Sequence, residues 1–161
     1  MRRITVMLFA LAGGFLLLMT GCNSDPVKKD IISYSKTVIP IINNFDDVIG
    51  KKLDEVSKEK DKNVFMKKTK GELLPILKDF REKVVAVKPA SKELQDVHNL
   101  YVDMVNTTES GMKLLVESLE KQDHSIYKVA MDKINAGQDM ENKYKSAFKE
   151  LATKHGVVLE Q

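Results

Sequence analysis

The 161-residue sequence contains one cysteine, Cys22, and no tryptophan. A single thiol excludes a disulfide within the chain, a Cys-x-x-Cys redox motif and a cysteine-based zinc site. Arginine is also scarce, because Arg81 is the only one after residue 21. Nucleic-acid binding usually requires clustered Lys and Arg beside aromatic stacking groups, so we expect no nucleic-acid partner.

The sequence also lacks the patterns that indicate common catalytic and metal sites. It has no glycine-rich phosphate loop, no Gly-x-Ser-x-Gly elbow, and none of the Glu-x-x-His motifs that di-iron bundles carry. We expect His98 at a helix boundary, His124 in a turn and His155 at a helix C-terminus, where the helix dipole favours it. The carboxylates of Asp46 and Asp47 are expected on a solvated face. We therefore predict no enzyme, no cofactor and no metal.

The first 21 residues have the layout of a secretory signal. A positive start, Arg2 and Arg3, is followed by a mostly apolar run over residues 4–19 and by small residues before Cys22. A membrane-spanning helix needs about 20 predominantly apolar residues. The shorter run here favours a cleaved signal over an uncleaved membrane helix. Ordinary secretion with Cys22 as a free or disulfide-bonded thiol is a further alternative.

The residues before Cys22 resemble the lipobox of small bacterial lipoproteins, Leu-x-Gly-Cys, with Met19 in place of the commoner leucine. This resemblance implies cleavage by signal peptidase II after Gly21 and attachment of diacylglycerol and palmitate to Cys22. It further implies a lipid-anchored protein on the extracytoplasmic side of the cell membrane. The preference for lysine over arginine is typical of low-GC Gram-positive bacteria. The resemblance covers only the signal and the lipobox.

After Cys22, apolar residues recur every three or four positions, which predicts amphipathic helices. Four such stretches are separated by short polar segments. They cover residues 26–57, 64–87, 94–119 and 126–155.

Local signals predict where these helices begin and end. Asp25 is a suitable N-cap for the first helix, Ser91 for the third, and Asp123 or Ser125 for the fourth. Gly156 stands where a left-handed C-cap residue is expected after the fourth helix.

Four long helices with short turns predict an all-α fold, an up-down-up-down four-helix bundle of long antiparallel helices without a sheet. We expect a cleaved signal peptide over residues 1–21 and a lipidated tether over 22–25. The bundle should cover 26–156, and a C-terminal tail 157–161.

Two prolines inside helical stretches, Pro40 and Pro75, are expected to kink their helices. Counting residues from the base of the bundle places them at similar heights. This predicts a mid-bundle pocket for a small apolar ligand, whereas the alternative is two kinks filled by ordinary core. The residues expected to line the pocket are Ile39, Leu74, Met104 and Met140.

Two glycines, Gly111 and Gly137, also match in height, on the third and fourth helices. Glycine inside a helix costs about 0.5–1 kcal/mol relative to alanine. We therefore predict a close approach of these two helices, although an unconstrained, solvent-facing Gly111 is an alternative.

The segment from Lys51 to Lys70 carries eight lysines and four acidic residues. In an up-down bundle it lies at the end opposite the lipid anchor. Lys58, Lys60 and Lys62 are therefore candidates for contact with an anionic cell-wall polymer or an acidic protein. A solvated turn of mixed charge is the alternative. The sequence thus predicts a non-catalytic binding or interaction module at the cell surface, and alternatively a carrier of a small apolar ligand.

Overall fold

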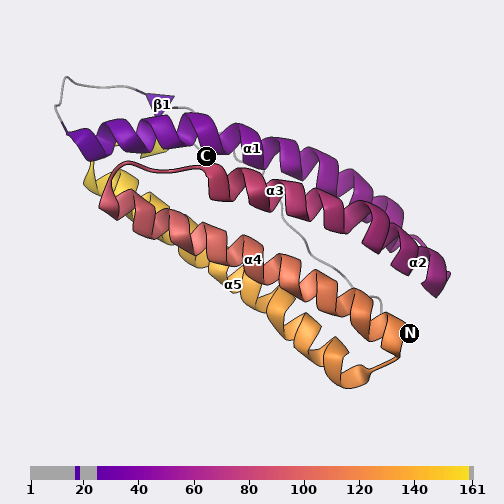
Figure 1. The fold of residues 1–161 in the computed structure, drawn as a ribbon. Coiled ribbons are helices and arrows are strands. Elements are labelled where there is room, and N and C mark those ends of the chain that lie inside the picture. Colours follow the sequence, from indigo (N-terminus) through magenta and orange to yellow (C-terminus); the bar gives the residue numbers. More distant parts are fainter. Residues whose placement is uncertain (1–16, 19–24, 160–161) are drawn as a thin grey trace.

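The computed structural model describes residues 17–18 and 25–159. The fold of these residues is all-α, and Figure 1 shows long helices lying side by side. A short π-helical segment, η1 (Thr69–Leu73), connects α2 to α3 without a break. The helices are α1 (Pro26–Ser57), α2 (Lys62–Lys68), α3 (Leu74–Ala86), α4 (Lys92–Lys121) and α5 (His124–Lys154).

The starts of α1 and α5 follow the predicted capping chemistry. The Asp25 carboxylate accepts hydrogen bonds from the backbone N–H groups of Val27 and Lys28. Asp123, rather than Ser125, caps α5 by accepting from the N–H groups at the first turn of that helix. Each cap satisfies donors that have no partner within the helix.

The end of α5 is also as predicted. Gly156 has a positive φ of 62°, which costs glycine little because it has no Cβ. Its N–H donates to the carbonyl of Thr153, and the N–H of Val157 donates to the carbonyl of Ala152. These two bonds form a Schellman motif. Val157 is buried, so the core extends one residue beyond the predicted boundary at Gly156.

The predicted cap at Ser91 is incorrect in one respect. Ser91 occupies the N-cap position of α4, but its side chain makes no capping hydrogen bond. Its hydroxyl instead donates to the Asp30 carboxylate on α1, at 2.7 Å, and its N–H donates to the same group. The residue joins two elements of the fold rather than completing its own helix.

The second predicted helix, 64–87, is not uniform. Pro75 has no N–H, so the α-helical hydrogen bond to the Gly71 carbonyl cannot form. Immediately before it the chain widens into η1, where the Leu74 N–H donates five residues back to the Thr69 carbonyl. π-Helices are rare and occur mostly as single turns inside α-helices, as this one does. The helix then ends at Ala86, one residue earlier than expected.

Aromatic side chains connect the helices through the core. Phe45 on α1 stacks on Phe80 on α3, with ring centroids 3.8 Å apart. Phe80 meets the edge of Tyr101 on α4, and Tyr101 lies 4.5 Å from Tyr144 on α5. Four helical segments, namely α1, the continuous run of α2, η1 and α3, α4, and α5, therefore share one hydrophobic core.

The predicted close approach of the last two helices is confirmed. A Cβ added to Gly111 on α4 would lie 2.9 Å from the Ile134 side chain and 3.1 Å from the Ala130 carbonyl on α5. A Cβ added to Gly137 on α5 would lie under 3.0 Å from the Thr108 hydroxyl on α4. Both glycines thus allow the two backbones to pack more closely than any larger residue would.

One very short strand pair accompanies the helices. β1 (Leu17–Leu18) pairs antiparallel with β2 (Val158–Leu159). With two residues in each strand it leaves the all-α class unchanged, and it places part of the predicted C-terminal tail in a defined element.

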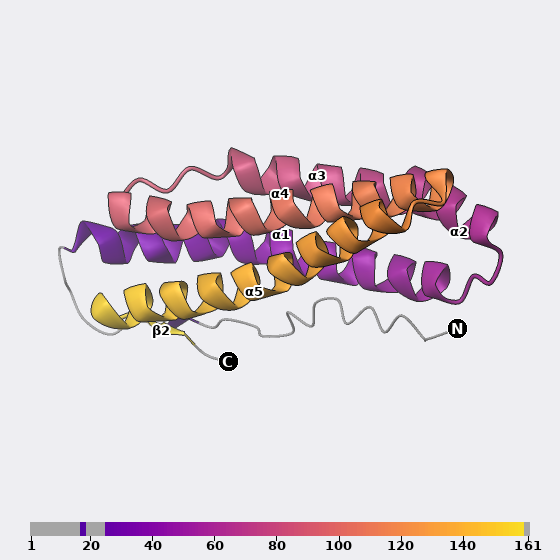
Figure 2. The same ribbon diagram turned by 90° about the horizontal axis from the view of Figure 1, so that it is seen from below.

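The elongated body has two distinct ends, which both views show (Figures 1 and 2). At the end that we call the Asp25 end, α1 and α4 begin and α5 finishes. At the other, the lysine-rich end, residues 58–61 connect α1 to α2 and residues 122–123 connect α4 to α5.

Candidate functional site

The three lysines predicted to contact an anionic partner lie at the lysine-rich end. Lys58 forms an ion pair with Asp54 one turn earlier on α1. Lys60 and Lys62 are exposed, and neither forms an ion pair with any of the residues that the structure describes. The carboxylates nearest to them in sequence are engaged elsewhere, so their charges face solvent uncompensated.

Hydrogen bonds define the conformation of the connection that carries these lysines. Asp61 caps α2 by accepting from the N–H groups of Asn63 and Val64, at 2.7 and 3.2 Å. Glu59 accepts from the N–H of Lys60 and from the ammonium group of Lys68. The connection is therefore a turn with a defined, hydrogen-bonded conformation, and its lysine side chains lie at one end of the molecule.

Other lysines of the 51–70 segment fall into two groups. Lys52, Lys68 and Lys70 are neutralised by ion pairs, and the pair of Lys70 with Glu120 at 2.9 Å joins this segment to α4. Lys51 and Lys67 are exposed without an ion pair among the described residues. The uncompensated positive charge consists of Lys51, Lys60, Lys62 and Lys67.

The Asp25 end is held by polar contacts between residues far apart in sequence. The His155 imidazole lies 2.7 Å from the Asp25 carboxylate and 3.5 Å from that of Glu93, which also pairs with Lys154. The hydrogen bond from His155 lowers the pKa of Asp25, and those from Lys154 and His155 lower that of Glu93. These contacts join the start of α1, the start of α4 and the end of α5 at the Asp25 end. Cys22, the predicted lipidation site, lies outside the described residues.

His98 is not the helix-boundary residue that the sequence suggested. It is 4% exposed, and its Nδ1 lies 3.0 Å from the Tyr34 hydroxyl. Burial lowers the pKa of His98, and the nearby Lys88 charge acts in the same direction. The neutral imidazole therefore joins α1 to α4 as part of the core.

Tyrosines extend this polar cluster toward α5. The Tyr34 hydroxyl also lies 3.4 Å from that of Tyr144. Burial raises the pKa of Tyr144 to about 12, and it also raises the pKa values of Tyr34 and Tyr101 well above their ordinary range. All of these phenols stay protonated at physiological pH. The cluster is closed to solvent, which is expected of a structural network rather than of a catalytic site.

Asp46 is a second residue whose environment the sequence did not reveal. It was expected on a solvated face, whereas both of its carboxylate oxygens are buried and have no hydrogen-bond partner among the described residues. Burial raises the pKa of Asp46 to about 6, helped by the negative charge of Glu141 on α5. The adjacent Asp47 is exposed, as predicted.

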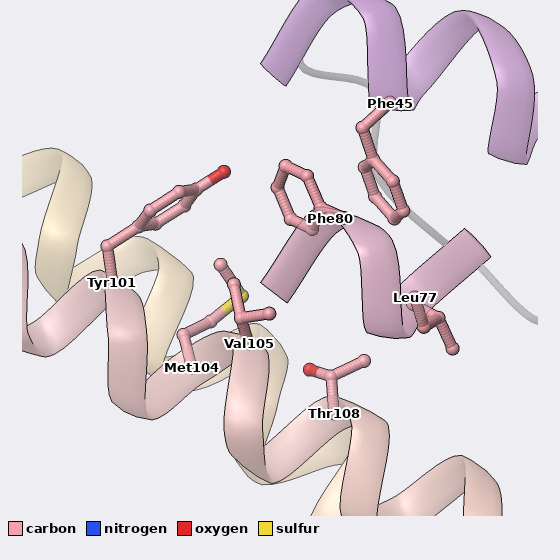
Figure 3. Close-up of a pocket in the computed structure, with 7 residues that line it drawn as sticks. All are labelled: Phe45, Leu77, Phe80, Tyr101, Met104, Val105 and Thr108. Carbon is pink, nitrogen blue, oxygen red and sulfur yellow. The ribbon is translucent and has the colours of Figure 1, made fainter. Parts of the chain in front are cut away.

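The structure does not gather the predicted pocket residues around one cavity. Met104 lines an interior cavity of about 10 Å³, enough for about one water molecule. Ile39, Leu74 and Met140 are partly buried and pack against the core elsewhere. The residues that surround the cavity are shown in Figure 3 and are Phe45, Leu77, Phe80, Tyr101, Met104, Val105 and Thr108.

The two prolines do not share a level. Phe45 stacks on Phe80 and Lys52 pairs with Glu72, so contacts between α1 and α3 run in opposite sequence order. Pro40 and Pro75 each precede one of the stacked rings by five residues, and therefore lie on opposite sides of that stack, about 15 Å apart. The expected match counted Val87 as the base, but residues 87–91 are an extended segment that continues downward from α3.

A larger hollow lies at the surface between α1 and α3. This groove has a volume of about 320 Å³, and Pro75 is on its wall. Its lining is mainly apolar, with Asn44 and the Asp79–Lys83 ion pair as polar groups. The full set of lining residues is Ile41, Asn44, Phe45, Val48, Pro75, Ile76, Asp79, Phe80 and Lys83.

Within residues 17–18 and 25–159, no helix is both long and apolar enough to cross a bilayer. The same residues contain no group of three or more His, Cys, Asp or Glu side chains placed to hold a metal ion.

Comparisons with known proteins give no relative for this chain. No protein-family model matches it, and neither the curated proteins nor the solved structures include a significant match.

Proposed function

We propose that the protein is a lipid-anchored, extracytoplasmic, non-catalytic binding module at the cell surface. In this proposal a diacylglycerol on Cys22 holds the chain at the membrane. The lysine-rich end faces outward and meets an anionic partner, either a cell-wall polymer or an acidic protein. The observation that carries the proposal is the uncompensated charge of Lys60 and Lys62 at the end farthest from the start of α1.

The proposed orientation depends on how close α1 begins to Cys22. Helix α1 starts at Pro26, with Asp25 as its cap. The four residue steps from Cys22 to Pro26 would span at most about 14 Å when extended. Two acyl chains hold a protein stably at a bilayer, whereas one alone does not. A short tether of this kind would keep the Asp25 end beside the membrane.

We further propose that the four helical segments form an up-down-up-down bundle. Contacts in opposite sequence order support this arrangement for each consecutive pair. Between the first and second segments, Asp30 contacts Ser91 and Phe45 contacts Phe80. Between the second and third, Lys70 pairs with Glu120 and Arg81 pairs with Glu109. Between the third and fourth, Thr108 lies close to Gly137, and Gly111 lies close to Ile134.

Attraction between the lysine-rich end and its partner would be electrostatic and therefore sensitive to salt. Exposed charges are screened over about 8–10 Å at physiological ionic strength. We expect binding of isolated wall polymer or of an acidic partner to weaken steeply as salt is raised.

The test is binding by the protein in which Lys58, Lys60 and Lys62 are all changed to Glu. Cell-wall material and cross-linked partners are recovered from intact cells and compared with those of the wild type. A matched control changes Lys36, Lys143 and Lys149, which are exposed and form no ion pair with a described residue. Loss of binding in the first variant alone is expected. Equal binding by the wild type and both variants would overturn the proposed surface.

The alternative function is transport of a small apolar ligand. The groove between α1 and α3 favours it, because about 320 Å³ lies at the lower end of the volumes of small-molecule sites. A carrier should retain its ligand during gentle purification, so native mass spectrometry should show an added mass. That mass should be absent after Ile76→Glu, which places a charge in the groove.

A further inference from the structure

The Asp46 carboxylate is unlike the other acidic groups of α1. Asp25 caps the helix, Asp30 accepts three hydrogen bonds from the segment that precedes α4, and Asp54 pairs with Lys58. Among the residues that the structure describes, Asp46 has no such partner, and both of its carboxylate oxygens are buried away from water. A buried carboxylate without hydrogen bonds is costly in its ionised form.

Charged and titratable groups approach Asp46 from three helices. On α5, Glu141 is 8% exposed and pairs with Lys145 at 2.6 Å. On α4, Tyr101 is 1% exposed, and its hydroxyl is also buried without a hydrogen-bond partner among the described residues. On α1 itself, Asp47 adds a further negative charge. Among the described residues, Lys145 is the cation that lowers the pKa of Asp46, and it already pairs with Glu141.

This arrangement favours a neutral Asp46. Glu141 and Asp47 repel the ionised carboxylate, and burial removes the water that would otherwise stabilise it. Protonation removes the repulsion and creates an O–H donor. The Glu141 carboxylate and the Tyr101 oxygen are the acceptors in its surroundings, so the proton can replace a repulsion between α1 and α5 by an attraction.

We propose that Asp46 is a proton-binding site that sets how firmly α1 is held against α4 and α5. When the proton is bound, α1 is seated against the other two helices. When it is lost, a buried negative charge faces Glu141 and the contact loosens. Helix α1 is suited to this role because its backbone approaches α4 and α5 less closely than those two approach each other.

The pH range of the effect follows from the raised pKa of Asp46, about 6 in the fold against 3.8 for an ordinary Asp. Between these values the folded protein binds a proton that the unfolded chain has lost. Stability from this group is therefore complete below about pH 4 and is lost as pH rises through about 6. Loss of the Asp46 proton therefore loosens α1 when the pH rises from mildly acidic to neutral values. This effect does not depend on the proposed lipid anchor.

The experiment compares thermal unfolding of the purified wild type, Asp46→Asn and Asp47→Asn between pH 4.5 and 7.5. Relative to Asp46→Asn, the wild-type Tm should fall by about 3–6 °C over this range, after allowance for solvent screening. Other titrating groups cancel in this difference, and Asp47→Asn, which removes only the smallest of the influences that raise the pKa of Asp46, should keep most of the wild-type fall. Parallel curves for the wild type and Asp46→Asn would overturn the proposal.

Two measurements on the unmutated protein keep the test independent of whether the variants fold. The Asp46 carboxyl carbon should titrate with a midpoint near 6 by NMR, and a midpoint near 4 would contradict the proton site. Hydrogen exchange, corrected for intrinsic rates, should show α1 amides losing protection relative to α4 between pH 5 and 7.5. A uniform change in all helices would contradict the specific loosening of α1.

Discussion

Replacing Gly137 by alanine should force α4 and α5 apart. The added Cβ would lie less than 3.0 Å from the Thr108 hydroxyl, a separation that real Cβ atoms essentially never show. Thr108 is itself 4% exposed, so it has little room to move away. Overpacking of this kind costs about 1–3 kcal/mol, whereas alanine recovers about 0.5–1 kcal/mol of helix preference. We expect a net loss of about 1–2 kcal/mol.

Thermal unfolding measures this loss as a decrease in Tm of about 3–6 °C for a domain of this size. Gly50 on α1 is the matched control, because nothing lies within 4 Å of a Cβ added there. Gly50→Ala should therefore stabilise the protein by about 0.5–1 kcal/mol. In a Thr108→Ala background, Gly137→Ala should lose most of its penalty. Equal stabilisation by the Gly50 and Gly137 substitutions would refute the close packing of α4 and α5.

Three further substitutions test polar contacts, one of them as a control. Arg81→Met removes one of the two 2.7 Å partners of Glu109, which is 4% exposed, and leaves only Lys113. It should cost about 1–3 kcal/mol in chemical denaturation. Lys78→Met, at an exposed pair, should cost under about 0.5 kcal/mol, and equal losses would contradict the buried role of Glu109. Asp30→Asn should lower Tm at pH 7. The hydrogen bonds from Ser91 and Ala90 outweigh burial and lower the pKa of Asp30, so this loss should disappear as pH falls below about 3.8.

The helices and most of their ends could be predicted because the signals are local. Apolar spacing of three and four, Asp25 and Asp123 before their helices, and Gly156 after the last helix are signals that act over a few residues. The close approach at Gly111 and Gly137 was also predictable, since it follows from helix lengths and short turns. Pro75 indicated an irregularity in the second helix. Whether the helix kinks there or forms a π-helical turn depends on the residues packed around it.

The sites that sequence reasoning missed lie beside the apolar stripes. Asp46 follows Phe45 directly and stands four residues after Ile42, so it is at the edge of the buried face of α1. His98 is likewise four residues after the buried Leu94. Their spacing is a usable signal of burial. Their partners could not be predicted, because these come from other helices.

The prediction that Pro40 and Pro75 lie at similar heights along the bundle was wrong for a different reason. Heights along a bundle can be counted only when the length of every connection is known. The backbone is extended at Val87 and Ser91, and extended residues rise by more than helical ones do. Pro89 predicts that the helix stops before it, but it does not predict how far the chain travels before the next helix begins. The Asp30–Ser91 contact, which fixes the base of the fold, is a long-range feature of the same kind.

The proposed lipid anchor is tested most directly by mass spectrometry of the N-terminal peptide from protein purified out of the membrane fraction. Trypsin should release a peptide that begins at Cys22 and carries the mass of a diacylglycerol, with or without a further acyl chain. Cys22→Ala should abolish both the lipid and the cleavage. An unmodified Cys22, or a peptide that continues from residues 1–21 into the helical domain, would contradict the anchor and the orientation proposed from it.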